Sequence, residues 1–270
     1  MLPDSQDQIT ATRIGIVGTG TIAEAMVNGF LSRRKDGLSI LLSPRGAAVA
    51  ARLTSRYPQT VRAGESNQAV LNGCSIVILS VRPQVLREVL SGLIFRPDHL
   101  VISVVAGFSR NAILSLVAPS RQVTLAIPLP AIERGNAPTV LLPPNESAAA
   151  LFSRGGSVTA VEDERAYAAL GTSTAIMASY FALAKTVTQW LANENVPQAE
   201  AGSYIAHLLQ GLSETTQLKT SEGFQALEEY HATPGSFNDA LRSHLKEQGA
   251  FKAVETGLDQ LMKKMTGETP

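Results

Sequence analysis

A glycine-rich stretch near the start of the chain has the residue types and spacing that suit dinucleotide binding. Residues 14–23 read IGIVGTGTIA, a short apolar run that ends in Gly-x-Gly-x-x-Ala and leads into an amphipathic segment. Gly18 would permit a tight turn, the missing side chain of Gly20 would let a pyrophosphate approach the backbone, and Ala23 would let a helix pack closely on the strand. The start of that helix offers free N–H groups to phosphate. This strand–turn–helix context favours dinucleotide binding over a structural turn.

The residues that follow the second predicted strand bear on which dinucleotide binds. A cofactor with a free adenosine ribose usually meets an Asp or Glu about 20 residues past the glycines. This chain has Ser43-Pro44-Arg45 at that place. A carboxylate would repel a 2′-phosphate, whereas a hydroxyl and a guanidinium would bind one. The sequence therefore favours NADP over NAD, and the alternative is that Arg45 is a solvated loop cation.

Segments that follow two further predicted strands are also expected beside the cofactor. Ser80-Val81-Arg82-Pro83 follows one strand, and Ala106-Gly107-Phe108 follows the next. Ligands of doubly wound sheets gather at the carboxyl ends of the strands, although each segment taken alone also suits a structural turn. The residues predicted to bind the cofactor are Gly18, Gly20, Thr21, Ile22, Ser43, Arg45, Ser80, Val81, Arg82, Pro83 and Ala106.

Strands and helices that alternate along the chain must position these residues. One expected strand begins near Arg13, and a short one begins at Val61. The other expected strands cover 38–42, 75–80, 100–105, 123–127, 139–142 and 158–161. The expected helices cover 21–32, 46–57, 84–93, 111–117 and a segment from about Glu146. This alternation predicts an α/β fold with a Rossmann-type, doubly wound and mostly parallel sheet, which we place at residues 1–162.

The rest of the chain, residues 163–270, is expected to be an all-α domain. Residues 168–192 are apolar nearly all round with Lys185 as their one charge, so this helix should be buried. Asn195-Val196-Pro197 separates it from a second helix with an apolar stripe, at 200–219. A region of this size is small for covering such helices within one subunit. We therefore predict an obligate homodimer through the helical domain.

A Pro-Gly turn interrupts the later helices. It reads Thr233-Pro234-Gly235-Ser236-Phe237-Asn238 and precedes helices expected at 239–248 and 251–266. Asn238 suits an ordinary helix cap, and that interpretation would suffice by itself. The same helix N-terminus could hold a substrate carboxylate.

Charge and cysteine content argue against several classes of function. The chain has 23 basic and 23 acidic residues and no basic tract, so neither nucleic acid nor an anionic membrane is an expected partner. With Cys74 as its single cysteine, the chain can form neither an intrachain disulfide nor a cysteine-based metal cluster, and no metal site is expected. Cys74 itself is expected to be a small buried residue. Residues 1–12 are polar and lack the apolar core of a signal peptide, and no uninterrupted apolar run of about 20 residues occurs. We expect a cytoplasmic protein.

Four segments occur in an order and spacing that resemble the Δ1-pyrroline-5-carboxylate reductase family. They are VGTGTIA at 17–23, SVRPQVL at 80–86, VISVVAG at 101–107 and TPG at 233–235, within a resemblance that runs from about residue 13 to 265. The resemblance implies a Rossmann domain followed by a helical dimerisation domain. It also implies reduction of a cyclic imine that bears a carboxylate, usually with NADPH, which gives proline and places the activity in proline biosynthesis.

The substrate side departs from that family's pattern. The family's Gly-Ser-Gly-Pro-Ala-Tyr is AIMASY at 175–180, its Met-Pro-Asn-Thr-Pro is IPLPA at 127–131, and its Thr-Pro-Gly-Gly-x-Thr is TPGSFN at 233–238. By this resemblance Asn238 replaces the hydroxyl that the family places near the imine nitrogen, and Phe237 adds bulk. The predicted catalytic residues that contact the substrate are Thr233, Ser236 and Asn238.

The chain offers no evident strong general acid, and the proposed chemistry does not require one. A cyclic imine is basic enough to take up a proton, and the protein must position it against the nicotinamide and exclude water. His99 and His244 are expected at exposed positions and His207 within an apolar helix. His231 is the histidine placed suggestively, two residues before Thr233.

Two other functions stay open from the sequence alone. A β-hydroxyacid dehydrogenase shares the two-domain plan and uses a Lys of the interdomain helix as acid and base, which Lys185 would supply. The simpler interpretation is that Lys185 reaches solvent or a dimer partner by its stem. The altered substrate motifs also suit a non-catalytic homologue that binds NADPH and dimerises without turnover.

Overall fold

The computed structural model describes residues 11–32 and 37–266, which form two compact units. The first unit extends to Gly171 and the second begins at Thr172. The helix α7 (Glu164–Ser173) crosses from one unit into the other. The boundary placed between residues 162 and 163 therefore stays a prediction. Most of the polar N-terminal segment, residues 1–10, lies outside the described residues.

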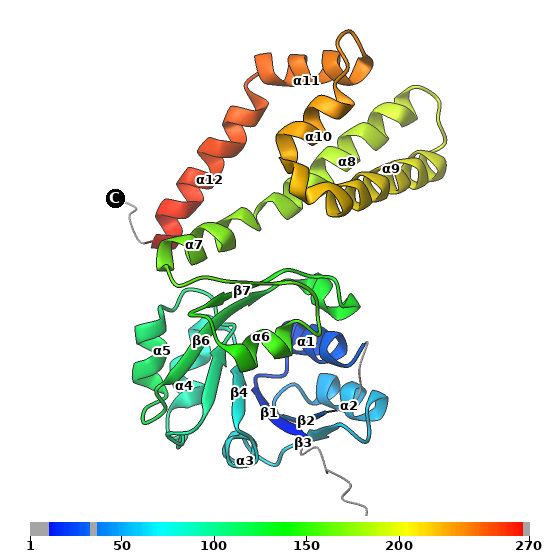
Figure 1. Ribbon diagram of the computed structural model, residues 1–270. Helices are drawn as coiled ribbons and strands as arrows, with labels where there is room; N and C mark the ends of the chain where they lie inside the picture. Colours follow the sequence, from blue (N-terminus) through cyan, green and yellow to red (C-terminus); the bar gives the residue numbers. More distant parts are fainter. Residues whose placement is uncertain (1–10, 33–36, 267–270) are drawn as a thin grey trace, which may run out of the picture. The chain divides into compact units, whose positions relative to one another are not determined.

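An eight-stranded sheet forms the centre of the first unit, in the order β3-β2-β1-β4-β5-β6-β7-β8 (Figure 1). The strands are β1 (Thr12–Val17), β2 (Leu38–Leu42), β3 (Val61–Ala63), β4 (Ile76–Leu79), β5 (Leu100–Ser103), β6 (Gln122–Pro128), β7 (Thr139–Leu142) and β8 (Val158–Ala160). Neighbouring strands are parallel except β6 and β7. The predicted Rossmann-type sheet is confirmed. The chain leaves β1 toward β2 on one side and returns to β4 on the other, so the strand order reverses between β1 and β4.

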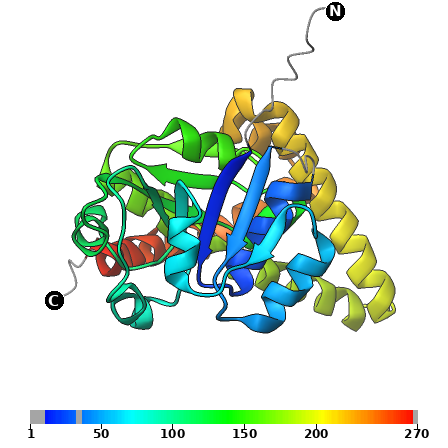
Figure 2. The same ribbon diagram turned by 90° about the horizontal axis from the view of Figure 1, so that it is seen from below.

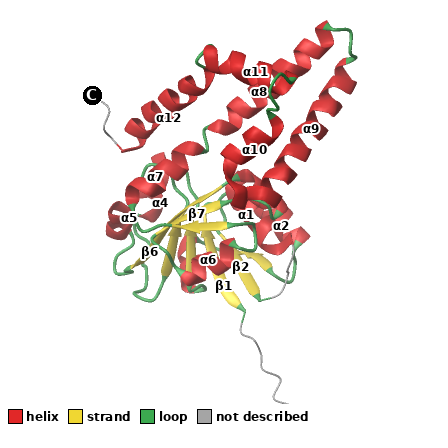
Figure 3. Ribbon diagram, turned by 45° about the horizontal axis from the view of Figure 1, so that its top comes forward, coloured by secondary structure: helices red, strands yellow, loops and turns green. Residues whose placement is uncertain are grey.

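Helices cover both faces of this sheet, as Figures 2 and 3 show. Ile76 and Ile78 pack in a cluster with residues of α1, α2 and α6, whereas Val77 and Leu79 pack in a second cluster with residues of α3, α4 and α5. The strand is apolar at every position because both of its faces are buried. This is why continuous apolar runs in the sequence predicted the strands well.

The helices of the first unit are mostly short. They are α1 (Thr21–Ser32), α2 (Ala47–Arg56), α3 (Asn67–Asn72), α4 (Leu86–Leu90), α5 (Arg110–Leu116) and α6 (Glu146–Phe152), with 3₁₀ turns η1 (Pro83–Val85) and η2 (Pro130–Arg134). The helix α3 was not expected; its N-cap is Ser66, whose hydroxyl accepts from the Ala69 N–H. The helix expected at 84–93 is instead η1 followed by α4, and it ends before Gly92, whose φ is +79°.

The second unit is all helical (Figure 1). Its helices are α8 (Ile176–Asn193), α9 (Gln198–Lys219), α10 (Gly223–His231), α11 (Phe237–Glu247) and α12 (Ala250–Thr266), with a 3₁₀ turn η3 (Thr220–Glu222). The helices α8 and α9 lie side by side as a hairpin, and Asn195, with φ +66°, reverses the chain between them. The single helix expected at 168–192 is two helices, because a turn at residues 174–175 separates α7 from α8.

Large apolar side chains of the second unit remain exposed. Within the described part of the chain, α8, α11 and α12 bury no residue, and α9 buries only Ala201 and Ile205. The expectation that 168–192 is buried is therefore wrong for the single chain. The exposed apolar side chains of α8 and α9 are Ile176, Met177, Tyr180, Phe181, Leu183, Trp190, Tyr204, Leu208, Leu212 and Leu218. By length and composition alone, Glu164–Asn193 is apolar enough to cross a membrane, which is weak evidence for a span.

Candidate functional site

The loop between β1 and α1 lies where the strand order of the sheet reverses. Gly18 has a φ of +100°, and a Cβ atom at this position would lie 2.5 Å from the carbonyl oxygen of Ser80 at the end of β4. Both the backbone conformation and the close approach require glycine there. A Cβ at Gly20 would meet no atom within 4 Å, so open space lies beside the second glycine. This is the arrangement that a phosphate approaching the backbone needs.

The start of α1 presents donors beside this space. The first turn closes with the Glu24 N–H donating to the carbonyl of Gly20 at 3.0 Å, and by helix geometry the N–H groups before it have no intrahelical acceptor. The carboxylate of Glu24 accepts hydrogen bonds from the Arg52 guanidinium at 2.7 and 2.9 Å. These bonds hold the pKa of Glu24 below its usual value. The paired acid therefore leaves the helix N-terminus favourable to an anion.

Ser43 has a different role from the one expected. Its side chain is buried, its Oγ accepts from the Gly18 N–H at 2.9 Å, and its carbonyl accepts from the Thr19 hydroxyl at 2.9 Å. The hydroxyl thus ties the glycine loop to the end of β2. This geometry does not favour the expectation that the Ser43 hydroxyl is presented to a 2′-phosphate. Arg45, two residues later in the chain, is exposed.

A pocket of about 550 Å³ opens along these loops. It is lined by Gly18, Thr19, Gly20, Thr21, Ser43, Arg45, Gly46, Asn67, Ser80, Val81, Arg82, Val85 and Val89. Eight of the residues predicted to bind the cofactor line it together; Ile22, Pro83 and Ala106 are not among its lining residues. Five lining residues were not predicted from the sequence: Thr19, Gly46, Asn67, Val85 and Val89. A Ser-Asn pair ahead of an apolar stretch is a helix-start signal that would have located Asn67.

The charges of the pocket suit an anionic ligand. Arg45 and Arg82 both line it and are exposed, and none of its lining residues is Asp or Glu. Asn67 adds an amide from the start of α3, while Val85 and Val89 supply an apolar surface. A ligand that combines phosphates with a flat ring system matches this set of groups.

Ser80 also points to a ligand. Its hydroxyl is buried, lines the pocket and has no hydrogen-bond partner among the described residues. A buried hydroxyl without a partner costs free energy, about 1–3 kcal/mol, unless a ligand or water satisfies it. Together with the space at Gly20, this orphaned group shows that the residues present fit a dinucleotide.

The residues predicted to contact substrate lie together at the start of α11, in the second unit. Ser236, rather than Asn238, is the N-cap: its Oγ accepts from the Asp239 N–H at 3.2 Å. Asn238 lies within the helix and its amide donates to the carbonyl of His231 at 3.1 Å. The helix begins two residues earlier than expected because Ser236 caps it. Phe237 is 95% exposed, and Thr233 is exposed as well.

The structure gives the surroundings of other residues that the sequence singled out. His99 is fully buried, with its Nε2 3.1 Å from the carbonyl of Leu71, so the expectation of an exposed position is wrong. Lys185 is exposed on α8, which does not favour its use as a buried acid and base. Cys74 is buried, as expected, and burial raises the pKa of its thiol to about 11. Within the described ranges, no group of three or more His, Cys, Asp and Glu side chains is placed to hold a metal ion.

Comparisons with known proteins agree with this fold. A protein-family model described as NADP oxidoreductase, coenzyme F420-dependent, matches residues 13–107. A pyrroline-5-carboxylate reductase of Escherichia coli is 24% identical over 263 residues, which cover 93% of this chain and 96% of that protein. The crystal structure of the Streptococcus pyogenes 1-pyrroline-5-carboxylate reductase superposes with a TM-score of 0.80 at 18% identity, covering 95% and 99% of the two chains. That of the Plasmodium falciparum enzyme, with NADP bound, gives 0.77 at 14% identity, covering 95% and 97%.

The Rossmann sheet, the glycine loop and these relatives indicate an oxidoreductase of the class that uses a nicotinamide cofactor. More narrowly, the chain is similar to pyrroline-5-carboxylate reductases over nearly its whole length.

Proposed function

We propose that this protein is an NADPH-dependent reductase that transfers a hydride to the C=N carbon of a small cyclic imino acid, as a proline-forming enzyme or a close variant of one. The observation that carries this proposal is similarity to pyrroline-5-carboxylate reductases over nearly the whole chain, combined with a pocket that offers two arginines and no carboxylate. The hydride is supplied by the reduced nicotinamide when it is bound.

The chain's own residues have defined tasks in this proposal. The glycine loop and the start of α1 bind the pyrophosphate through backbone N–H groups. Arg45 binds the 2′-phosphate that distinguishes NADPH from NADH, since a guanidinium forms charge-assisted hydrogen bonds with phosphate oxygens. Arg82 lines the same pocket and lowers the cost of bringing a multiply charged anion there.

The substrate side is assigned to Thr233, Ser236 and Asn238 at the start of α11. The N-terminus of this eleven-residue helix favours a carboxylate, as the dipole of any helix does. The Asn238 amide donates to His231, so its oxygen stays available to accept a hydrogen bond from a protonated imine nitrogen. Because such an imine takes up its proton from water, no residue has to supply a strong acid.

The exposed apolar helices support a homodimer as part of this proposal. Ten large apolar side chains of α8 and α9 face solvent in the single chain, which is far more than a soluble monomer usually leaves uncovered. A second copy would bury them in an interface of the obligate type. In this form we expect a soluble, cytoplasmic enzyme.

Turnover with a panel of imines tests the proposed function. Purified protein is mixed with NADPH or NADH and with five- and six-membered cyclic imines, each with and without a carboxylate, and the loss of dihydronicotinamide absorbance is followed. We expect turnover with a carboxylate-bearing ring and a higher kcat/KM with NADPH. NADPH binding without turnover on any imine would instead identify a non-catalytic homologue.

A further inference from the structure

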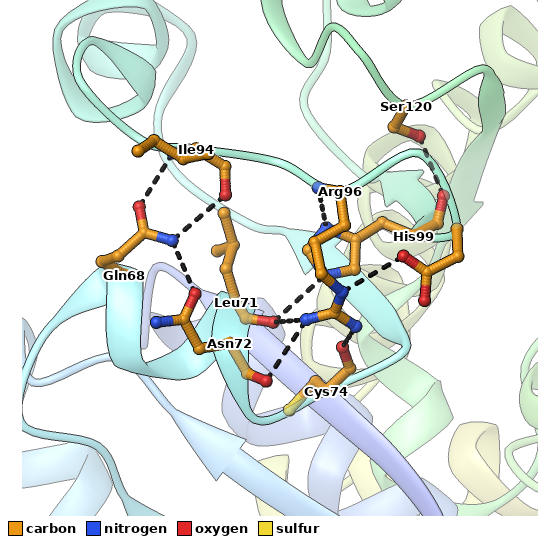
Figure 4. Close-up of polar contacts among 9 residues, drawn as sticks. Gln68, Leu71, Asn72, Cys74, Ile94, Arg96, His99 and Ser120 are labelled. Atoms are coloured by element: carbon orange, nitrogen blue, oxygen red, sulfur yellow. Dashed lines mark hydrogen bonds and ion pairs between the residues drawn. The ribbon is translucent and has the colours of Figure 1, made fainter.

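One wall of the nucleotide pocket is held in place by contacts that lie outside the pocket. Asn67, at the start of α3, lines the pocket together with Val85 and Val89 from the η1–α4 segment. The loop that follows α4, residues 91–99, runs along α3 and bonds to it at both ends (Figure 4). These contacts therefore set how α3 and the η1–α4 segment are spaced.

The first contact fixes the start of α3. The Gln68 side chain accepts from the Ile94 N–H at 2.8 Å and donates to the Ile94 carbonyl at 3.1 Å, so one amide satisfies both backbone groups of Ile94. The same amide donates to the Asn72 side chain at 2.8 Å. Because Gln68 directly follows Asn67, this pairing holds the pocket-lining turn of α3 against the loop after α4.

The second contact fixes the end of α3. The Arg96 guanidinium donates to three carbonyls around the helix end, those of Leu71 at 3.1 Å, Asn72 at 3.2 Å and Cys74 at 2.8 Å. A cation at these carbonyls satisfies acceptors that the helix leaves open and complements its dipole. A six-residue helix has little stability of its own, so such contacts determine whether it forms.

His99 completes the arrangement, and its bonding requires a neutral ring. Nδ1 of the buried imidazole lies 3.1 Å from the Arg96 N–H and accepts from it, so the ring proton is on Nε2, which donates to the Leu71 carbonyl at 3.1 Å. The Ser120 hydroxyl bonds to the His99 carbonyl at 2.8 Å and holds the residue from the strand-β6 side. A second ring proton would point at the Arg96 N–H and add a positive charge beside the guanidinium.

We propose that Arg96 and His99 are positioning residues for the nucleotide pocket, which hold α3 so that Asn67 faces Val85 and Val89, and that protonation of His99 loosens this hold and weakens nucleotide binding. We call Gln68, Ile94, Arg96 and His99 the α3 clasp. The inference rests on the proposed use of a nicotinamide cofactor.

The charged and titratable groups around the imidazole are Arg96, Asp98 and Cys74. Asp98 accepts from Arg96 at 3.1 Å, and this bond lowers the pKa of its carboxyl, so it stays an anion. The Cys74 thiol, with a pKa raised to about 11, stays neutral. Burial, with the charge of Arg96, lowers the pKa of His99 below 6.5, which agrees with the neutral ring that the geometry requires.

Nucleotide affinity as a function of pH tests the clasp. Binding of NADP⁺ is measured by calorimetry between pH 5 and 8 for the wild type, for His99→Asn and for His99→Gln. Asn retains an acceptor for the Arg96 N–H, Gln retains a donor toward Leu71, and neither titrates. We expect the wild-type Kd to be constant above about pH 7 and to rise about fivefold or more on acidification, the lower end of usual coupling energies. Both variants should lack the part of this rise that is due to His99 and keep only the part due to titration of the ligand's own 2′-phosphate. The exposed His244 supplies a matched control, since His244→Asn should keep the wild-type profile.

Hydrogen exchange of the α3 amides gives a second measurement that needs neither nucleotide nor a variant. In the wild type, protection of the Val70 and Gly73 N–H groups, corrected for intrinsic exchange, should fall over the same pH range. Binding at neutral pH with equal pH profiles in the wild type and both variants would overturn the clasp, as would α3 protection that does not change with pH. Absence of NADP⁺ binding at every pH would instead refute the proposed function, while exchange would still show whether the clasp opens.

Discussion

Single residues set the shape of the pocket through backbone geometry as much as through side chains. Gly18 has a positive φ and lies close to the carbonyl of Ser80, and its N–H donates to the Ser43 hydroxyl. The loop before α1 is therefore fixed by one residue that has no side chain and by another whose side chain is buried. Arg45 and Arg82 then add charge to a preformed shape.

Gly18→Ala should abolish nucleotide binding and destabilise the first unit. The new Cβ would clash with the Ser80 carbonyl, and a positive φ is unfavourable for alanine. We therefore expect the free energy of unfolding to fall by about 2–4 kcal/mol. Urea unfolding and NADP⁺ titration measure the two effects. Gly249→Ala is the matched control, because Gly249 also has a positive φ, +71°, but open space around it; it should cost about 1 kcal/mol and leave affinity unchanged.

Arg45→Met should remove the preference for the phosphorylated cofactor. Loss of charge-assisted hydrogen bonds to a 2′-phosphate, worth about 1.5–3 kcal/mol, predicts a Kd for NADPH about 10- to 100-fold higher, with the Kd for NADH unchanged. Fluorescence titration with both cofactors measures this. Arg121→Met, at an exposed position outside the pocket, should alter neither. Equal weakening for NADPH and NADH would contradict a role at the 2′-phosphate.

Stability should also depend on His99. Its pKa is lowered in the folded protein, so below pH 6.5 the unfolded chain binds the proton more readily than the native one. The stability due to the neutral ring is thus complete above that pH and is lost as the pH falls toward the native pKa. Urea unfolding of the first unit at stepped pH should show this loss, and His99→Asn should reduce it; an identical slope would assign the acid sensitivity to other groups.

At the residue scale, the sequence predicted those pocket residues that a local sequence pattern identifies. The glycine loop and Arg45 are recognisable because spacing along the chain alone defines them. The partner of Ser43, the burial of His99 and the place of Asn67 depend on contacts between segments about 25 or more residues apart. Such contacts leave no trace in local spacing.

Among the elements, short helices with strong caps carry more of the pocket than their length suggests. The helix α3 has six residues, yet its start lines the pocket and its end is bonded by Arg96 and His99. The strands β4, β5 and β7 were predicted closely because every residue in them is buried. The helices that failed prediction were those interrupted by a turn, such as 168–192, or too short for a periodic pattern, such as α3.

Ser66→Ala should loosen α3 and weaken nucleotide binding. The Ser66 hydroxyl caps the helix through the Ala69 N–H at 3.1 Å, and loss of such a cap costs about 1 kcal/mol. Ser109→Ala removes an equivalent cap, on the Ala112 N–H at 3.2 Å, from α5, which does not line the pocket. Hydrogen exchange and NADP⁺ calorimetry on both variants should show equal local loosening but reduced affinity for Ser66→Ala alone. Equal affinities would argue against α3 as part of the binding wall.

At the scale of the whole molecule, the second unit leaves large apolar side chains exposed in the single chain. Its apolar helices were predicted from composition, and the structure shows that the chain itself does not cover α8. Whether another helix of the chain or a second copy packs on them could not be deduced from periodicity, because an apolar pattern is the same in both cases.

Phe181→Asp should shift the protein from dimer to monomer. The Phe181 ring is 69% exposed on α8, where a charge would oppose burial in an interface between copies. Analytical ultracentrifugation across the micromolar range should give a dimer for the wild type and a smaller mass for the variant. Ile94→Asp, an exposed apolar position of the first unit, should leave the mass unchanged. A wild-type monomer at all concentrations would refute the dimer.

The residues that line the pocket come from one continuous segment of the chain, which bears on how the gene can evolve. Every residue that lines the pocket lies in the segment from Gly18 to Val89, within the 13–107 stretch that matches the family described as NADP oxidoreductase, coenzyme F420-dependent. One stretch of gene therefore encodes the whole pocket, and duplication or recombination can transmit it intact. Substitutions in the last hundred codons, where the departures at 175–180 and 233–238 lie, can then alter the helical unit without changing any residue that lines the pocket.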